Sequence, residues 1–211
     1  MEIIFSKDKR AGFVKGLDGK VERDSFKAYL LQEYALKEIH TAKLVHGDVL
    51  CIDQSGGEAD GIIITHEKQA ALIYTADCFS VVIRDTQKLI AGIFHSGWRG
   101  TEINIIGKGI QKIRELGGKD LSAIIFPAIH RCCFEIGPEL VDRFTKAHIP
   151  IEYRDNKIFA DLKTTIKKQI TNDGIKLIED LSVCTCCDTS VYSYRRDKTT
   201  KRNLSFVALD I

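Results

Sequence analysis

Residues 61–94, GIIITHEKQAALIYTADCFSVVIRDTQKLIAGIF, are the stretch of sequence that decides the fold. Four short runs rich in Ile, Val and Ala are separated in it by polar and turn-forming residues. Runs of this length and composition, bounded by such residues, are typical of β-strands. We therefore predict strands at 61–65, 71–75, 81–84 and 89–94.

The same criteria predict further elements on both sides of this stretch. Additional strands are expected at residues 43–45, 49–52, 121–126, 191–194 and 204–209. Helical spacing of apolar residues predicts helices over 25–39 and 101–116, and Pro138 and Asp161 suit the first turn and the N-cap of two more. Many closely spaced strands with inserted helices predict an α/β or α+β fold with mixed β-sheets flanked by helices.

Length and composition limit the classes of protein to consider. A chain of 211 residues is a natural size for one domain, so we expect residues 1–211 to form a single domain. Thirty-one basic and 29 acidic residues give a net charge of only +2, which offers no general reason to expect nucleic acid or a membrane as partner. The N-terminus lacks the pattern of a signal peptide, and no apolar run has the length of a membrane span. The seven unevenly spaced cysteines favour a reduced, cytoplasmic protein.

Three segments each place a good metal ligand at the end of a predicted strand. They contain His46, Cys78 and His95, and the first and third continue into glycines. Imidazole and thiolate are donors that zinc prefers, and a catalytic zinc keeps three protein ligands and one open position. Such a metal lowers the pKa of its water toward ~7. The alternatives are buried structural residues, or a nucleophile–base pair of Cys78 with His95.

Two groups of cysteines are expected to lie outside any metal site. Cys132 and Cys133 are adjacent, and neighbouring side chains on an extended segment point to opposite faces. Cys184, Cys186 and Cys187 have no matching downstream pair of the kind found in structural zinc sites.

Several motifs resemble those of the YfiH-type laccase-domain family in order and spacing. They are Thr-Ala-Asp-Cys at 75–78, His-Ser-Gly-Trp-Arg-Gly at 95–100, Pro-Ala-Ile at 127–129 followed by Cys-Cys-Phe-Glu-Ile-Gly at 132–137, and Ser-Tyr-Arg-Arg-Asp at 193–197. The resemblance extends from about His46 to the C-terminus. It implies an α/β fold with mixed sheets, and a zinc site, with copper as the alternative metal, formed by His46, Cys78 and His95.

The resemblance also implies an activity. It favours a zinc-dependent purine nucleoside enzyme that carries out adenosine and inosine phosphorolysis and adenosine deamination, with purine nucleoside and phosphate as its small-molecule partners. The alternatives are a copper-dependent polyphenol oxidase, a zinc or cysteine hydrolase that edits peptidoglycan precursors, and a non-enzymatic zinc-stabilised binding protein. Only six histidines occur in the chain, too few for several copper sites.

Four further residues are candidates for roles around the metal. Asp77 is expected to orient a ligand or accept a proton, or else to form a turn. Arg99 is expected to bind phosphate or a purine edge, with a surface ion pair as its alternative. Arg195 and Arg196 suit an anion site, and pairing with acids such as Asp197 is the other interpretation.

Departures from the family pattern concern the substrate pocket and not the metal ligands. His130 follows Pro-Ala-Ile where the family has glycine, and Lys201 stands in the middle of a family Thr-Gly-Arg motif. The family's N-terminal segment with a Ser-Leu-Asn-Leu-Gly-like stretch has no counterpart in the forty or so residues before His46. The motifs therefore predict the metal site more directly than the physiological substrate, and they leave the oligomeric state open.

Overall fold

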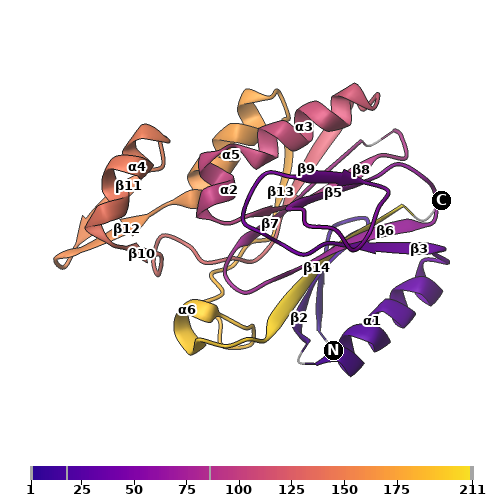
Figure 1. The fold of residues 1–211 in the computed structure, drawn as a ribbon, viewed down its shortest axis with the longest axis horizontal. Coiled ribbons are helices and arrows are strands. Elements are labelled where there is room, and N and C mark those ends of the chain that lie inside the picture. The colour runs from indigo at the N-terminus through magenta and orange to yellow at the C-terminus, as the bar shows by residue number, and fades with distance from the viewer. Residues whose placement is uncertain (1, 18, 86, 210–211) are drawn as a thin grey trace.

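Two β-sheets stacked face to face form the centre of the structure, and helices cover both outer faces (Figure 1). The computed structural model describes residues 2–17, 19–85 and 87–209. One sheet consists of β4 (Leu50–Ile52), β5 (Gly61–Ile64), β7 (Phe79–Asp85), β8 (Ala91–Ser96), β9 (Leu121–Ile125) and β13 (Leu177–Asp180), in the order β13-β9-β7-β8-β5-β4. The other consists of β1 (Ile3–Phe5), β2 (Ala11–Leu17), β3 (Glu38–Thr41), β6 (Gln69–Thr75) and β14 (Arg202–Leu209), in the order β1-β2-β14-β6-β3. Both sheets mix parallel and antiparallel pairs, which confirms the predicted fold class.

The helices pack on the outer faces of these sheets. Helix α1 (Lys20–Glu33) covers the five-stranded sheet, and α3 (Ile105–Glu115) and α5 (Leu162–Asn172) cover the six-stranded one. The short α2 (Trp98–Glu102) precedes α3, and α6 (Tyr194–Asp197) precedes β14. A small sheet of β10 (Glu135–Ile136), β11 (Ile151–Arg154) and β12 (Lys157–Ala160) lies to one side with η1 (Pro138–Leu140) and α4 (Val141–Lys146) (Figure 1). No helix among the described residues has both the length and the apolar character needed to cross a membrane.

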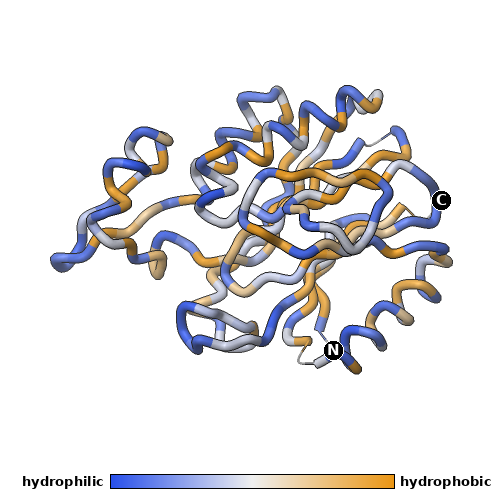
Figure 2. The backbone as a smooth tube through the Cα atoms, viewed as in Figure 1, coloured by the Kyte–Doolittle hydropathy of each residue, from blue (hydrophilic) through white to orange (hydrophobic). Residues whose placement is uncertain are grey.

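The apolar runs of the sequence form strands because both of their faces are buried. Ile62 and Ile64 of β5 face the neighbouring sheet, whereas Ile63 between them faces the helical layer. Side chains alternate along a strand, so a run of consecutive apolar residues serves two cores at once. Figure 2 shows the resulting concentration of hydrophobic residues along the central strands.

Two predicted helices have different bounds in the structure. The helix predicted over 25–39 begins earlier and ends at Glu33, because Ala35 adopts a left-handed conformation (φ 48°) and residues 38–41 pair with β6 as strand β3. The helix predicted over 101–116 is interrupted at Asn104, which has φ 58° and accepts a hydrogen bond from the Gly107 N–H. Asn104 therefore caps the N-terminus of α3, and the single helix predicted over 101–116 is divided between α2 and α3.

Two predicted strands are wrong. Residues 43–45 contribute only a single bridge, between Lys43 and Glu58. Residues 191–194 lead into α6, whose N-cap Ser193 accepts a hydrogen bond from the Arg196 N–H at 3.2 Å. Strands β1, β2, β13 and the small three-stranded sheet were not predicted.

Candidate metal centre

The three predicted metal ligands converge, although they are far apart in the sequence. One ligand atom each from His46, Cys78 and His95 lies within 4.8 Å of the other two. Cys78 comes directly before β7, and His95 lies on the neighbouring β8 opposite Ser80. His46 reaches the same place from the loop between β3 and β4, with its ring centroid 4.7 Å from that of His95. Pairing of β7 with β8 therefore positions two ligands, and a loop supplies the third.

Asp60 holds this group in place and was missed by the sequence analysis. Its carboxylate is fully buried and accepts hydrogen bonds from His95 Nδ1 at 2.8 Å and from the backbone N–H groups of His46 at 2.9 Å and Gly47 at 2.7 Å. Engagement of Nδ1 leaves Nε2 of His95 for a metal, as in carboxylate–histidine–zinc sites. Burial acts to raise the pKa of Asp60, but these hydrogen bonds and the charge of His95 lower that pKa overall.

The electrostatics of the metal-free site favour a thiolate beside an imidazolium. Burial acts to raise the pKa of Cys78, but the charge of His95 and hydrogen bonds from both histidines lower it to about 6. Burial acts to lower the pKa of His95, but the Cys78 thiolate and the Asp60 carboxylate raise it to about 9. The thiolate is thus already in the form that ligates a metal, whereas His95 must release its proton before Nε2 can ligate, so a bound cation would take the place of that proton beside Cys78 and Asp60.

This ionisation predicts the reactivity of the metal-free protein. After metal removal, alkylation of Cys78 by iodoacetamide should show a midpoint near pH 6, because the thiolate is the reactive form. Cys51 is an internal control, since burial raises the pKa of its thiol and it should react only at alkaline pH. Mass spectrometry of the labelled peptides measures both rates in one sample. A Cys78 midpoint near 8.5 would contradict the proposed ion pair.

The residues present suit a transition metal such as zinc. One thiolate and two imidazoles are soft and borderline donors, and His46 is exposed while His95 is 2% exposed, so the group is open on one side. Gly97 lets the backbone approach the ligands: a Cβ there would lie 3.0 Å from Cys78 Sγ and 3.5 Å from His46 Cδ2.

Substitution of this glycine should therefore disturb the ligands and little else. Gly97 has φ −70°, so Gly97→Ala introduces no backbone strain, but its methyl group must displace the Cys78 sulfur. We expect zinc affinity to fall about 10-fold, as for other changes next to metal ligands. Gly57, which has open space around its Cβ position, supplies the matched variant Gly57→Ala. Competition with a chromophoric chelator measures both, and equal affinities in the two variants would contradict this role.

Two adjoining cavities open next to the three ligands. The larger, of about 470 Å³, is lined by all three ligands together with Tyr74, Tyr194 and Arg202 among others. The smaller, of about 140 Å³, is mostly apolar, with Trp98, Ile129, Phe134 and Leu162 in its wall. Cys78 and Tyr194 line both cavities. Cys78 thus lies at the junction of the two cavities, of which the larger has the more polar lining.

Asp77 lies beside the site but is engaged elsewhere. Its Oδ1 accepts a hydrogen bond from Thr185 Oγ1 and its Oδ2 one from the Arg195 N–H, each at 2.6 Å. It adopts φ 90°, which is unusual outside glycine, and these two bonds hold it there. The carboxylate therefore ties the segment before β7 to α6 and to the loop before it, which suits a positioning role and not proton transfer.

The three arginines predicted to bind an anion differ in their surroundings. Arg99 is exposed on α2 and stacks 4.2 Å over the Trp98 ring, apart from the lining of either cavity. All three donor nitrogens of Arg196 are used, by Asp197 and by the carbonyls of the 185–191 loop. Arg195 lines the smaller cavity. Of the three arginines, only Arg195 therefore lies next to the candidate ligands, and Arg196 has the pairing with Asp197 that was its alternative interpretation.

Arg202 is a cation of the larger cavity that the sequence analysis passed over. It opens β14 and lines the cavity together with the three ligands. The signal was present, because Arg202 ends the segment that corresponds to the family's Thr-Gly-Arg motif.

Fold and site together define an α/β protein with a His-Cys-His group suited to one metal ion, and comparison with known proteins specifies it further. A family model described as multi-copper polyphenol oxidoreductase laccase matches residues 20–210. A protein of Aquifex aeolicus named purine nucleoside phosphorylase is 33% identical over 172 residues, which cover 81% of this chain and 79% of that protein. A Clostridium acetobutylicum protein also named as a purine nucleoside phosphorylase is 31% identical over 186 residues, covering 82% and 78%.

Solved structures agree in fold. The hypothetical protein YfiH of Bacillus licheniformis superposes with a TM-score of 0.81 at 22% identity, covering 94% of this chain and 92% of that one. YlmD of Geobacillus stearothermophilus gives a TM-score of 0.82 at 21% identity, covering 95% and 92%. The chain belongs to the multi-copper polyphenol oxidoreductase laccase family, which confirms the resemblance to YfiH-type proteins. Family and clustered ligands together indicate a metal-binding site in an enzyme of this family.

Proposed function

We propose that this protein is a zinc-dependent purine nucleoside enzyme that carries out phosphorolysis of adenosine and inosine and deamination of adenosine. The observation that carries the proposal is the opening of His46, Cys78 and His95 onto a cavity of about 470 Å³, within the size range of small-molecule sites. The relatives named as purine nucleoside phosphorylases supply the substrate class. We place the protein in the cytoplasm, where its seven free thiols would stay reduced.

The two cavities suit the two parts of a nucleoside. The smaller one has aromatic and aliphatic walls, including Trp98 and Phe134, that would bury the faces of a purine base. The larger one offers hydroxyl and guanidinium groups, from Tyr74, Tyr194 and Arg202, for ribose and phosphate. A zinc ion held by the three ligands at their junction would supply a Lewis acid and water of lowered pKa at neutral pH.

Phosphate binding in this proposal depends on Arg202 more than on Arg99. Removing a charged hydrogen-bond donor costs about 1.5–3 kcal/mol. Arg202→Ala should therefore raise KM for phosphate by about 10- to 100-fold in the phosphorolysis of inosine, whereas the matched Arg99→Ala should change it less than about 3-fold. Initial rates at varied phosphate measure both. A larger effect of Arg99→Ala would restore Arg99 as the phosphate ligand.

Product identification tests the proposed reactions. Zinc-loaded protein is incubated with adenosine, with and without phosphate, and the products are separated by chromatography. Deamination consumes water and gives inosine and ammonia, whereas phosphorolysis consumes phosphate and gives adenine or hypoxanthine with ribose 1-phosphate. We expect inosine in both samples and free base only with phosphate. If neither product forms, the purine nucleoside proposal is wrong for this protein.

A cysteine hydrolase is the second candidate. Asp60, His95 and Cys78 form a continuous chain in which the base is oriented by a buried carboxylate and the thiol is ionised. Such an enzyme would keep its activity in a chelator and lose it on alkylation of Cys78. The zinc enzyme would lose activity in the chelator and regain it with added zinc.

A further inference from the structure

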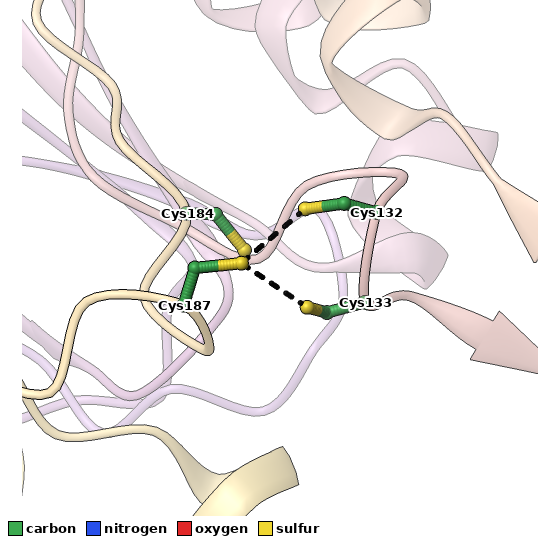
Figure 3. Close-up of side chains that lie close together, drawn as sticks. All are labelled: Cys132, Cys133, Cys184 and Cys187. Atoms are coloured by element: carbon green, nitrogen blue, oxygen red, sulfur yellow. Dashed lines mark hydrogen bonds between the residues drawn. The ribbon is translucent and has the colours of Figure 1, made fainter.

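Four cysteines that are distant from the candidate metal centre in sequence form a second compact group (Figure 3). The sulfur atoms of Cys132, Cys133, Cys184 and Cys187 all lie within 4.8 Å of one another. Cys187 Sγ is 3.6 Å from Cys132 Sγ and 3.4 Å from Cys133 Sγ. Zinc–sulfur bonds of about 2.3 Å in a tetrahedron place sulfurs about 3.8 Å apart, whereas a disulfide requires about 2.05 Å. The spacing is that of ligands around one ion.

The backbone explains why two adjacent cysteines face the same point. The expectation that they diverge assumed an extended segment, but residues 131–133 form a turn in which the N–H groups of Cys133 and Phe134 both donate to the His130 carbonyl. Cys184 and Cys187 form a Cys-x-x-Cys pair on a second turn, where the Cys187 N–H donates to the Cys184 carbonyl. The two cysteine pairs therefore face each other, contrary to the expectation that Cys132 and Cys133 point apart, and the second pair lies downstream of the first in the sequence.

Three guanidinium groups bond to the backbone that carries the four cysteines. Four thiolates around a divalent cation carry a net charge of −2, which needs nearby positive groups. Arg154, Arg195 and Arg196 donate to the carbonyls of Cys132, Cys133 and Cys186, at 3.1, 3.0 and 3.3 Å. The His130 N–H also donates to Cys184 Sγ at 3.4 Å, a bond of the kind that orients ligated thiolates.

We propose that Cys132, Cys133, Cys184 and Cys187 form a structural zinc site that joins the turn before β10 to the loop before α6. All four positions of the tetrahedron are filled by protein, so this centre has no open position for substrate. Cys132 and Cys187 are exposed, which gives the ion a route of entry, while Cys184 is buried at 9% exposure.

This centre fixes one wall of the smaller cavity. The turn before β10 leads to Phe134, and the loop before α6 carries Thr185 and leads to Arg195 within α6. Thr185 and Arg195 both donate to Asp77, the neighbour of Cys78. The four cysteines thus affect the candidate metal centre only by positioning Thr185 and Arg195, which bond to Asp77. The inference does not depend on which reaction occurs at that centre.

The test is the zinc content of variants in which the first group is disabled. His46→Ala/Cys78→Ser removes two of its three ligands, and this background should retain one zinc per chain after dialysis against a weak chelator. Adding Cys187→Ser should remove that zinc. The matched control adds Cys186→Ser, which changes a thiol in the same loop outside the group of four and should keep one zinc. A background without zinc, or equal zinc with and without Cys187→Ser, would overturn the proposal.

A measurement on the background variant alone remains decisive if the Cys187→Ser protein does not fold. X-ray absorption at the zinc edge should show sulfur scatterers only, at about 2.3 Å. Nitrogen or oxygen in the first shell would overturn the tetrathiolate assignment. A failure of the adenosine experiment would leave both outcomes unaffected, so the two proposals fail separately.

Discussion

Cys78→Ala should reduce kcat/KM for adenosine at least about 1000-fold while the protein remains folded. Loss of the thiolate leaves two imidazoles, too few to retain zinc under dilute conditions, and a 1000-fold loss corresponds to about 4 kcal/mol of transition-state stabilisation. Cys78 is half-buried at the cavity junction and is not part of the hydrophobic cores, so the fold should tolerate a methyl group there. Steady-state rates, zinc content and thermal unfolding are measured on the same preparation.

Cys51→Ala is the matched control for this substitution. Cys51 is also half-buried and donates a hydrogen bond from its thiol to the Gln54 carbonyl at 3.7 Å, and it belongs to neither of the described groups of candidate metal ligands. Its loss should leave kcat/KM within about 2-fold. Zinc-dependent turnover that survives Cys78→Ala would contradict the role of this cysteine as a ligand.

Asp60→Asn is expected to have the second-largest effect. Asparagine can accept one of the hydrogen bonds from the His46 and Gly47 N–H groups, but it lacks the charge that orients and polarises His95. Changes to such partners of metal-ligating histidines cost about 10- to 100-fold in metal affinity. Because the pair is buried, we also expect a loss of about 3 kcal/mol in the free energy of unfolding.

The pH dependence of the stability of the metal-free protein provides a further measure of the Asp60–His95 pair. The pKa of His95 is raised to about 9, so its contribution to stability is fully present below about pH 6.5 and is lost as pH rises through about 9. Asp60→Asn removes one cause of the raised pKa, and this loss should move to lower pH. Chemical denaturation of metal-free wild type and variant between pH 6 and 10 measures it.

Asp53→Asn separates the metal effect from general destabilisation. Asp53 makes a comparable set of contacts near the other end of β5, accepting hydrogen bonds from the N–H of Thr65 at 2.9 Å and from its Oγ1 at 2.6 Å. We expect it to lower stability without changing zinc affinity. If both variants weaken zinc binding equally, Asp60 has no specific relation to the metal ligands.

The parts of the fold that the sequence predicts are those with a strong local pattern. Strands β5 to β8 lie close to their predicted positions, because short runs of apolar residues bounded by turn-forming residues are typical of buried strands. The predicted helix bounds were wrong at Ala35 and Asn104, where a single residue interrupts the helix. Both residues adopt a left-handed conformation, which the spacing of apolar residues does not predict. Strands β1 and β2 lack such patterns; β2 is held by its pairing with β14, and β1 by its pairing with β2.

The residues of the candidate site also divide into those that the sequence predicts and those that only the structure reveals. His46, Cys78 and His95 were found because motif and ligand chemistry agreed, and the structure brings them together. Asp60 was missed because one acid before an apolar strand has no distinctive spacing. Its importance appears only when β5 and β8 pair and place it beside His95.

The grouping of the four cysteines was not predicted, for a different reason. They were judged by local spacing, and an adjacent pair combined with a Cys-x-x-Cys pair 51 positions later has no familiar pattern. The parallel bridge between Ala128 and Cys184 brings these segments together. For Arg196 the sequence left two interpretations open, and its bonds to loop carbonyls depend on the compact 185–191 turn that follows this bridge.

Anomalous diffraction from crystals of the zinc-loaded protein, recorded on both sides of the zinc edge, tests the central claim most directly. The account predicts an anomalous peak bonded to Cys78 Sγ, His95 Nε2 and a ring nitrogen of His46, with its remaining position facing the larger cavity. Absence of a peak among these three side chains in crystals that bind zinc elsewhere would contradict it.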